Sequence, residues 1–183
     1  AGGRRQGALE GGVVEAVAEA AAVPVEQLRR AAMLAGSSSQ AAAVAFEHGV
    51  AGLAKFTLTP FRPVLPMLAG TALSCDDALQ QLGELGAEWK LDGARVQLHR
   101  QGEDVRIFTR QLNDVTKSLP ELVELARTLP CESVILDGEV LVMQPDGSPA
   151  PFQTTMRRVG RSKHVATLRQ ELPVTPFFFD CLL

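Results

Sequence analysis

The stretch EWKLDGARVQLHR, residues 88–100, places a lysine, an aspartate and an arginine close together in a strand-like run. Side chains alternate along a strand, so Lys90 and Asp92 are expected to share one face. A lysine amine attacks an electrophile only in its neutral form, which burial or a neighbouring cation such as Arg95 favours. The Arg95 guanidinium can bind phosphate, and Asp92 can hold a divalent metal or position the lysine. These residues suit attack on phosphorus with loss of a phosphate-rich group, although a solvated polar strand has the same composition.

The overall composition is typical of a soluble globular protein with a core, since 46% of the 183 residues are hydrophobic and 21% are charged. The net charge of −3 gives no bulk sign of nucleic-acid binding, which would need a local basic face. The three cysteines form no C-x-x-C pair, which argues against disulfides or zinc and favours a reducing, cytosolic setting. The three histidines lack metal-ligand spacing, and no stretch has the pattern of a membrane span or a signal peptide.

The first part of the chain is helical in pattern. Small residues at helical spacing predict helices over residues 9–22, 25–36 and 37–49. The first is expected to stop before Pro24, and Gly36 is a C-cap candidate for the second. The third is expected to have Ser39 as its N-cap and to end at Gly49. On pattern alone, this region could be a plain helical scaffold.

A proline-rich stretch, FTLTPFRPVLPMLAG, separates this region from the rest. Its three prolines, Pro60, Pro63 and Pro66, exclude a helix and predict an extended linker packed along a surface. We place the domain boundary here, with residues 1–58 in one unit and residues 59–183 in the other.

The second unit mixes helix and strand signals. The capping-box patterns Ser74…Asp77 and Ser118…Glu121 predict two helices. Strands are predicted around the turn QGED, before the turn PDGS and in the final TPFFFDCLL. Hairpins with interspersed helices indicate an α+β domain with antiparallel sheet. The sequence stops inside an apolar strand, so we expect more protein to follow in the parent chain.

Several motifs occur in the order found in one enzyme superfamily. The stretch K-L-D-G-A-R resembles motif I of the covalent nucleotidyltransferases, which comprise ATP-dependent DNA ligases, RNA ligases and mRNA capping enzymes. FTRQLNDVT resembles the ligase F-S-R element with Arg110 as its arginine, LDGEV resembles motif III with Glu139, and FFFD resembles motif IIIa with Phe179. The helical residues and RPVLPMLA are similar to the end of a helical DNA-binding domain and the segment leading into a ligase adenylation domain. The best match is a bacterial or archaeal ATP-dependent DNA ligase.

The resemblance implies a role for each motif residue. Lys90 would attack the α-phosphate of ATP and become lysyl-AMP. Glu88 would read the adenine amino group, and Phe179 would stack on the adenine ring. Arg95 and Arg110 would contact the ribose and phosphates and later the 5′-phosphate of a nick.

The acidic motif residues are implied to bind the nucleotide and Mg²⁺. Glu139 would accept from a ribose hydroxyl or help hold the metal, and Asp92 would assist metal binding or the attack by the 3′-hydroxyl. Four of these residues could instead have a purely structural role. Phe179 could be a core residue, and Glu139 could lie on the solvent-exposed face of a hairpin. Arg110 could pair with Asp114, and Glu88 could be a carboxylate at the end of a strand.

The stretch MRRVGRSKHVATLR is basic and contains no acidic residue. It resembles the arginine-rich element between motifs III and IIIa of ligases, which implies contacts with DNA phosphates by Arg157, Arg158, Arg161 and Lys163. The alternative is a solvated basic helix face.

The resemblance implies an enzyme that adenylates the 5′-phosphate of nicked double-stranded DNA and joins it to the 3′-hydroxyl. It further implies a role in DNA repair, replication or recombination and a cytoplasmic location at the nucleoid.

The alternatives are an RNA ligase, a capping-type enzyme or a non-catalytic DNA-binding relic. A plain α+β scaffold would explain the core but not the motif series. NAD-dependent ligases share the lysine chemistry, but the helical segment favours ATP. Because motifs IV and V and an OB fold do not follow Leu183, we expect these 183 residues alone to bind adenine nucleotide weakly at best and to seal no nick.

Overall fold

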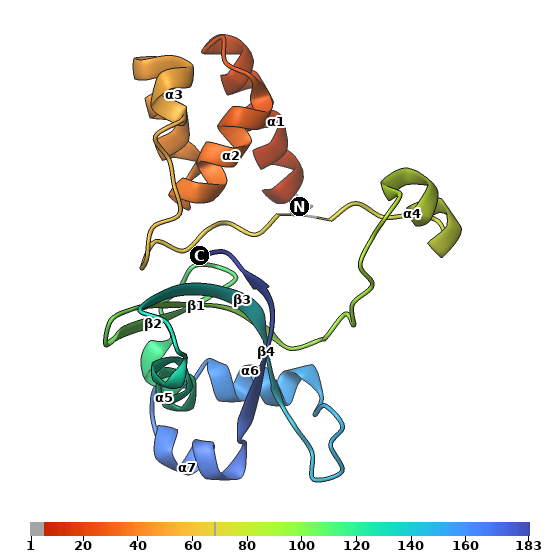
Figure 1. Ribbon diagram of the computed structural model, residues 1–183, viewed down its shortest axis with the longest axis vertical. Coiled ribbons are helices and arrows are strands. Elements are labelled where there is room, and N and C mark those ends of the chain that lie inside the picture. The colour runs from red at the N-terminus through yellow and green to blue at the C-terminus, as the bar shows by residue number, and fades with distance from the viewer. Residues whose placement is uncertain (1–5, 68) are drawn as a thin grey trace, which may run out of the picture.

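The computed structural model describes residues 6–67 and 69–183. It begins with three packed helices, α1 (Gln6–Ala20), α2 (Val25–Ala35) and α3 (Ser38–Leu53) (Figure 1). Their shared core combines small alanines, among them Ala31 and Ala41, with larger Leu28 and Leu53. Small side chains let the helix axes approach closely. The three helices confirm the predicted helical segment.

The ends of these helices differ from prediction in detail. Gly36 is the C-cap of α2 in the left-handed conformation, with φ of 66°, as predicted. The N-cap of α3 is Ser37, whose Oγ accepts from the Gln40 backbone N–H at 3.3 Å. The prediction of Ser39 was wrong, because α3 starts immediately after the Gly36 turn. Gly49 does not end the helix but kinks it, with φ of 55°.

The proline-rich stretch forms no helix or strand over its described residues, 56–67 and 69–70, as predicted. It is fastened to the buried side chains of Gln97 and His99. Val64 donates its N–H to Gln97 Oε1 at 2.9 Å and accepts at its carbonyl from Gln97 Nε2 at 2.7 Å. The Phe61 N–H donates to His99 Nδ1 at 3.1 Å. An amide side chain can replace a strand neighbour in this way because it has both a donor and an acceptor.

His99 is neutral at ordinary pH. Burial lowers its pKa to about 4, and an Nδ1 that accepts from Phe61 leaves the proton on Nε2. His99 is therefore a buried, hydrogen-bonded structural residue. The Leu65 N–H also donates to the Met33 carbonyl of α2 at 3.1 Å. The backbone of the linker is therefore hydrogen-bonded to α2 on one side and to side chains of the sheet on the other.

The second unit is built on one four-stranded antiparallel sheet. Its strands are β1 (Ala94–Gln101), β2 (Asp104–Thr109), β3 (Ser133–Val142) and β4 (Val174–Cys181), in the order β2-β1-β3-β4. The linker lies against one face, and α5 (Pro120–Thr128) and α6 (Phe152–Val159) pack on the other (Figure 1). A seventh helix, α7 (Val165–Glu171), lies beside α5. The predicted α+β fold with antiparallel strands is confirmed.

The first predicted capping box is present and begins α4 (Cys75–Leu82), which projects away from the sheet (Figure 1). Ser74 Oγ accepts from the Asp77 N–H at 3.1 Å, and the Asp77 carboxylate accepts from the Leu73 N–H at 2.9 Å. In the standard capping box the carboxylate accepts from the N–H of the N-cap residue, here Ser74. In this helix it accepts instead from the N–H of the preceding residue, Leu73.

The second predicted capping box was wrong. Ser118 ends a short 3₁₀ turn, η1 (Thr116–Ser118), and α5 begins two residues later at Pro120 without a side-chain cap. The Ser118 carbonyl oxygen and the Glu121 carboxylate both accept hydrogen bonds from Arg158 of α6. The Glu121 carboxylate, which would have completed the capping box, is thus bound to a tertiary partner.

Within the described residues, no helix has the length and apolar character needed to cross a bilayer.

Candidate active site

Lys90 and Asp92 lie outside the sheet, which contradicts the prediction that they share the face of a strand. Strand β1 begins only at Ala94, and residues 85–92 form no helix or strand. At Gly93 the chain comes very close to β3: an added Cβ would lie 2.4 Å from the Val140 carbonyl oxygen and 3.0 Å from Glu139 Cγ. Only glycine permits this approach, and the lysine segment leaves the sheet there.

A cavity of about 430 Å³ opens where β1 extends beyond the end of β2. Val96 is the first residue of β1 that pairs with β2, so Ala94 and Arg95 have no partner on β2. We call this cavity the lysine notch. Its lining includes five residues predicted from sequence and others that were not: Lys90, Asp92, Arg95, Arg110 and Glu139, with Leu91, Gly93, Ala94, Thr109, Gln111, Phe152, Met156 and Val159.

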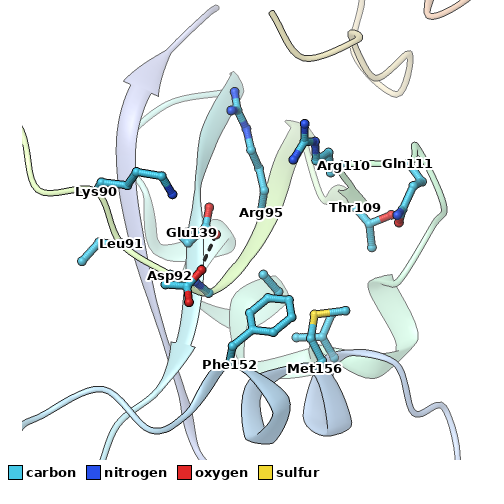
Figure 2. A pocket seen from close by; sticks show the side chains of 13 residues that line it. Lys90, Leu91, Asp92, Arg95, Thr109, Arg110, Gln111, Glu139, Phe152 and Met156 are labelled. Carbon is cyan, nitrogen blue, oxygen red and sulfur yellow. Dashed lines mark hydrogen bonds between the residues drawn. The ribbon is translucent and has the colours of Figure 1, made fainter. Parts of the chain in front are cut away.

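The side chains divide the lysine notch into regions of different chemistry (Figure 2). Lys90 and the two carboxylates lie on one side, Arg95 and Arg110 extend along another, and Phe152 and Met156 project from α6 opposite the arginines. Cations suit phosphate oxygens, and an apolar wall suits a flat or aliphatic group. The predicted residues therefore meet in one cavity despite being spread over three separate segments.

Glu139 is half-buried and tied to the start of β1. Its Oε1 accepts from the Gly93 N–H at 3.2 Å. Burial raises the pKa of Glu139, while the bond from Gly93 and the charges of Arg95 and Lys90 oppose the rise. The Asp92 carboxylate contributes further to the rise, which shows that the two acids feel each other.

Asp92 and Glu139 form a pair of oxygen ligands rather than a complete metal cage. Among the described residues, no group of three or more potential ligands clusters to hold a metal ion. Mg²⁺ is commonly bound by one or two carboxylates together with substrate phosphates and waters. Two acids beside phosphate-binding cations therefore fit this ion.

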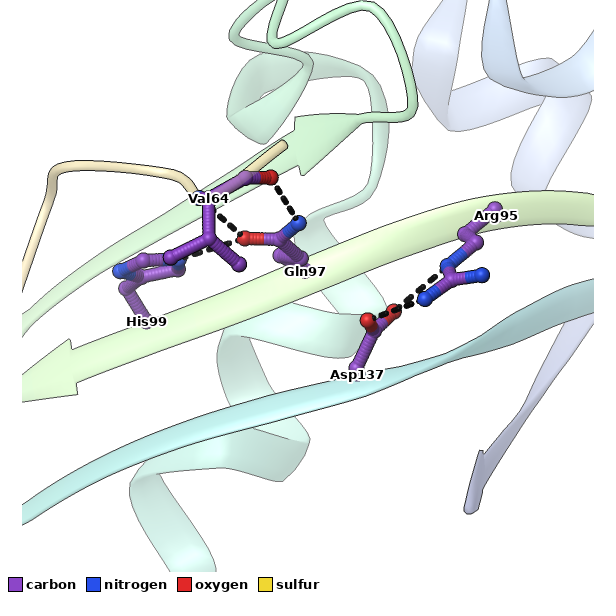
Figure 3. Close-up of polar contacts among 5 residues, drawn as sticks. All are labelled: Val64, Arg95, Gln97, His99 and Asp137. Atoms are coloured by element: carbon purple, nitrogen blue, oxygen red, sulfur yellow. Dashed lines mark hydrogen bonds and ion pairs between the residues drawn. The ribbon is translucent and has the colours of Figure 1, made fainter. Parts of the chain in front are cut away.

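Arg95 is held by Asp137, a residue that sequence analysis overlooked (Figure 3). Arg95 Nε and Nη2 donate to the two Asp137 carboxylate oxygens at 2.9 and 2.6 Å, and these hydrogen bonds raise the pKa of Arg95. Asp137 is only 4% exposed. Arg95 stands opposite Glu139 in the strand register, so it reaches diagonally to Asp137. Alternation within LDGEV puts Asp137 and Glu139 on the same face, a signal that could have identified it.

The two residues predicted to contact adenine do not line the lysine notch. Glu88 is exposed in the irregular segment before Lys90. Phe179 is 44% exposed on β4, so it is not a core residue. Its ring lies 5.4 Å from the Arg95 guanidinium carbon, which places it beside the cations of the notch.

Lys90 and Arg110 are both exposed. Burial, one of the two means considered for keeping the lysine neutral, is therefore absent. The alternative that Arg110 pairs with Asp114 is excluded, because Asp114 bonds to Arg106 at 3.2 Å. Arg110 makes no ion pair with any described residue, so its guanidinium is free to meet an anion.

The basic stretch is split between surface and core. Arg157, Arg161 and Lys163 are exposed, as a phosphate contact requires. Arg158 is completely buried and ion-paired with Glu121. The prediction that Arg158 contacts DNA was wrong, because it shares the inward face of α6 with buried Thr155 and Val159 at helical spacing.

Comparison with known proteins assigns the family. Residues 66–183 match the family model for the ATP dependent DNA ligase domain. A probable DNA ligase of Anaeromyxobacter sp. (strain Fw109-5) is 54% identical over 178 residues, or 97% of this chain and 34% of its own length. A probable DNA ligase of Sorangium cellulosum (strain So ce56) is 52% identical over 182 residues, or 100% of this chain and 34% of its own length.

Among solved structures, the ligase domain of LigD from M. tuberculosis is 30% identical, with a TM-score of 0.42 over 52% of this chain and 28% of that one. The chain spans about a third of the length of the curated relatives it matches. The match of residues 66–183, which is more than half of the sequence, shows that the chain belongs to the ATP-dependent DNA ligase family.

Proposed function

We propose that this chain forms part of the catalytic core of an ATP-dependent DNA ligase, with Lys90 as the residue that becomes adenylated. The observation that carries the proposal is the meeting of Lys90 with two arginines and two acids in one cavity, in a chain of this family. A plain α+β scaffold has no need for such a set on its surface. RNA ligase and capping alternatives lose support, because the family matched is that of DNA ligases.

The proposed reaction has three transfers. The neutral Lys90 amine forms a bond to the α-phosphorus of ATP while the bond to pyrophosphate breaks. The 5′-phosphate of a nick in double-stranded DNA then displaces the lysine and takes the AMP. The 3′-hydroxyl finally attacks that 5′-phosphorus, loses its proton and releases AMP. Arg95 and Arg110 offset the charge on the phosphates in each transfer.

Mg²⁺ would be held by Asp92 and Glu139 together with phosphate oxygens, and it would offset the charge of the departing pyrophosphate. Glu139 is also placed to accept from a ribose hydroxyl. We propose Glu88 as the reader of the adenine amino group and Phe179 as its stacking partner. The exposed Phe179 ring beside Arg95 supports the second assignment.

We assign residues 1–58 to the end of a helical DNA-binding domain and residues 59–183 to the start of an adenylation domain. Two separate cores support two units: one joins α1–α3 with Phe56 and also includes Val64 of the linker, and the other lies between the sheet and α5–α6. The proposed setting is the cytoplasm, at the nucleoid, in DNA repair, replication or recombination.

The direct test is intact-protein mass after incubation with Mg²⁺ and ATP, with GTP and NAD in parallel, on the full-length protein that contains these 183 residues. We expect one added AMP with ATP and none with GTP, and peptide mapping should locate the AMP on Lys90. A GMP adduct would favour the capping-type alternative. An AMP adduct from NAD but not from ATP would contradict the proposed cofactor.

Asp137→Asn is expected to slow AMP transfer roughly 10- to 100-fold, the loss that corresponds to a charge-assisted hydrogen bond. The amide keeps the shape of the side chain but cannot offer two acceptor oxygens to Arg95. The measurement is the single-turnover rate of AMP adduct formation, with exposed Asp104→Asn as the matched control. A wild-type rate in Asp137→Asn would show that Arg95 keeps its position without the carboxylate.

Charge reversal at Arg157 and Arg161 is expected to make binding to nicked duplex less salt-dependent. For each DNA phosphate that the variant no longer binds, the magnitude of the slope of log K against log salt should fall by about 0.9. Fluorescence anisotropy over a salt series measures the slope, and Arg127→Glu on α5 is a single charge-reversal control outside the basic stretch. An unchanged slope in the double variant would assign these arginines to a solvated helix face.

A further inference from the structure

Arg110 is presented to the lysine notch by a tight turn at the end of β2, which we call the Arg110 turn (residues 109–113). The Leu112 N–H donates to the Thr109 carbonyl at 2.8 Å, so Arg110 and Gln111 are the two central residues of a β-turn. The Thr109 N–H donates to the Asn113 carbonyl at 2.9 Å and closes the turn. Both central residues line the notch (Figure 2). The position of the Arg110 guanidinium therefore depends on how firmly this turn is held.

Leu112 has an unusual backbone conformation for its side chain. Its φ of 64° lies in the left-handed region, which glycine and asparagine adopt more readily than a bulky aliphatic residue does. The backbone alone would therefore favour glycine at this position. A contact made by the leucine side chain can offset that preference.

The Leu112 side chain lies against the N-terminal helices, at the turn between α2 and α3. A Cβ added to Gly36 would lie 3.3 Å from Leu112 Cδ1 and 2.8 Å from the Pro63 carbonyl oxygen. Gly36 thus leaves room for both neighbours, in addition to its left-handed role as the C-cap of α2. Three segments meet at this point: the α2–α3 turn, the linker and the Arg110 turn.

The linker holds the α2–α3 turn in place relative to the sheet. Val64 is hydrogen-bonded in both directions to the amide of Gln97 on β1 (Figure 3), and the Leu65 N–H donates to the Met33 carbonyl, three residues before Gly36. The surface that Leu112 contacts is therefore fixed with respect to β1, the strand that carries Arg95 into the notch.

The Arg110 turn has open space on two sides. A second cavity, of about 1,130 Å³, lies between the N-terminal helices and the linker, and Arg110 and Gln111 line it as well as the lysine notch. Space that holds no protein atoms gives the turn no support. The contact between Leu112 and Gly36 is therefore expected to contribute strongly to the position of the turn.

We propose that Leu112 is a positioning residue, which docks the Arg110 turn on the N-terminal helices and thereby sets where Arg110 stands in the lysine notch. The helices would then help to shape the site of AMP transfer without lining it. This inference rests on the proposed function, because it takes Arg110 as a residue that binds phosphates during AMP transfer. Loosening the contact should slow that transfer through Arg110, although Leu112 itself does not line the notch.

The test is a double-mutant cycle in the full-length protein that contains these 183 residues. Leu112→Asn tolerates the left-handed conformation but loses the methyl groups that face Gly36. It is expected to slow single-turnover formation of the AMP adduct roughly 10-fold, since a 1 Å misplacement in an active site can cost about 100-fold. In the Arg110→Gln background the same change should have no further effect, because the two residues act as one unit. His164→Asn, at another left-handed position with φ of 57°, is the matched control and should react at the wild-type rate.

Hydrogen–deuterium exchange without nucleotide gives a readout that does not depend on AMP transfer. Peptides that span residues 108–114 are expected to exchange faster in Leu112→Asn and in Gly36→Asn, but not in His164→Asn. Asparagine at position 36 can keep the left-handed cap of α2, while its Cβ enters the space beside Leu112 and Pro63. A change in the helices would thus loosen a turn that lies more than 70 residues later.

Three results would overturn the positioning role: a wild-type rate in Leu112→Asn, an equal slowing with and without the Arg110 side chain, or unchanged exchange in the Arg110 turn. None of them would contradict AMP transfer by Lys90. Conversely, faster exchange in both asparagine variants without any AMP adduct in wild type would support the docking of the turn and contradict the proposed catalysis.

Discussion

Replacing Lys90 with alanine is expected to abolish formation of the AMP adduct, with a loss of at least about 1,000-fold. Lys90 is the sole lysine that lines the described notch, and the two arginines beside it are not nucleophiles because they stay protonated. Lys90→Arg should be as inactive as Lys90→Ala even though it retains the positive charge. The pair of variants therefore separates the nucleophilic role of Lys90 from an electrostatic one.

Binding and chemistry can be distinguished in the same variants. Trp89 is the only tryptophan of the chain and is 93% exposed beside Lys90, so its fluorescence is a suitable reporter of nucleotide binding. Lys90→Arg is expected to retain the ATP-dependent fluorescence change while forming no adduct. Lys163→Ala, an exposed lysine elsewhere, should form the adduct at the wild-type rate. An AMP adduct on Lys90→Ala would remove Lys90 from the centre of the mechanism.

Replacing Arg158 with methionine is expected to destabilise the fold by about 3–5 kcal/mol. Arg158 is fully buried and holds α6 to α5 by donating to Glu121 and to the Ser118 carbonyl oxygen. Methionine would fill much of the volume but leave a carboxylate and a carbonyl unpaired in the interior. Urea unfolding of the two proteins measures the difference. The neighbouring exposed Arg157→Met is the control and should change stability by less than about 0.5 kcal/mol.

The double variant Arg158→Met with Glu121→Leu is expected to recover most of this loss. The ion pair is not fully satisfied: Arg158 Nε and Glu121 Oε2 lack hydrogen-bond partners among the described residues. An apolar pair carries no such desolvation cost. If the double variant were as unstable as Arg158→Met alone, the loss would come from misfit of methionine rather than from the stranded carboxylate. Because α6 also supplies Phe152 and Met156 to the lysine notch, the single variant should weaken AMP transfer as well.

Local patterns were enough to predict many elements of this fold. The αL cap at Gly36, the hairpin turn at Gly102 and the cap of α4 at Ser74 each depend on residues within a few positions of one another. The same holds for the strand that precedes the turn PDGS and for the order of motifs that resemble a ligase. Such features follow from backbone sterics and short-range hydrogen bonds, which the sequence displays directly.

The residues that sequence analysis placed wrongly have partners far along the chain. Arg158 belonged by composition to a basic surface stretch, but its ion pair with Glu121, 37 residues away, draws it into the core. That pairing also occupies the Glu121 carboxylate, which the predicted capping box would have used. Lys90 lies outside the predicted strand, which begins only after Gly93, where the chain comes close to residues of β3 more than 40 positions later.

The sequence by itself determined which chemical groups this protein has and the family to which their order points. The tertiary structure decided which of them meet. It fixed Arg95 against Asp137 across 42 residues and placed Arg110 between two cavities. It also selected which arginines remain free for phosphate. These outcomes depend on burial and on competition between distant partners, because a charge in the interior must be paired whatever its neighbours in sequence.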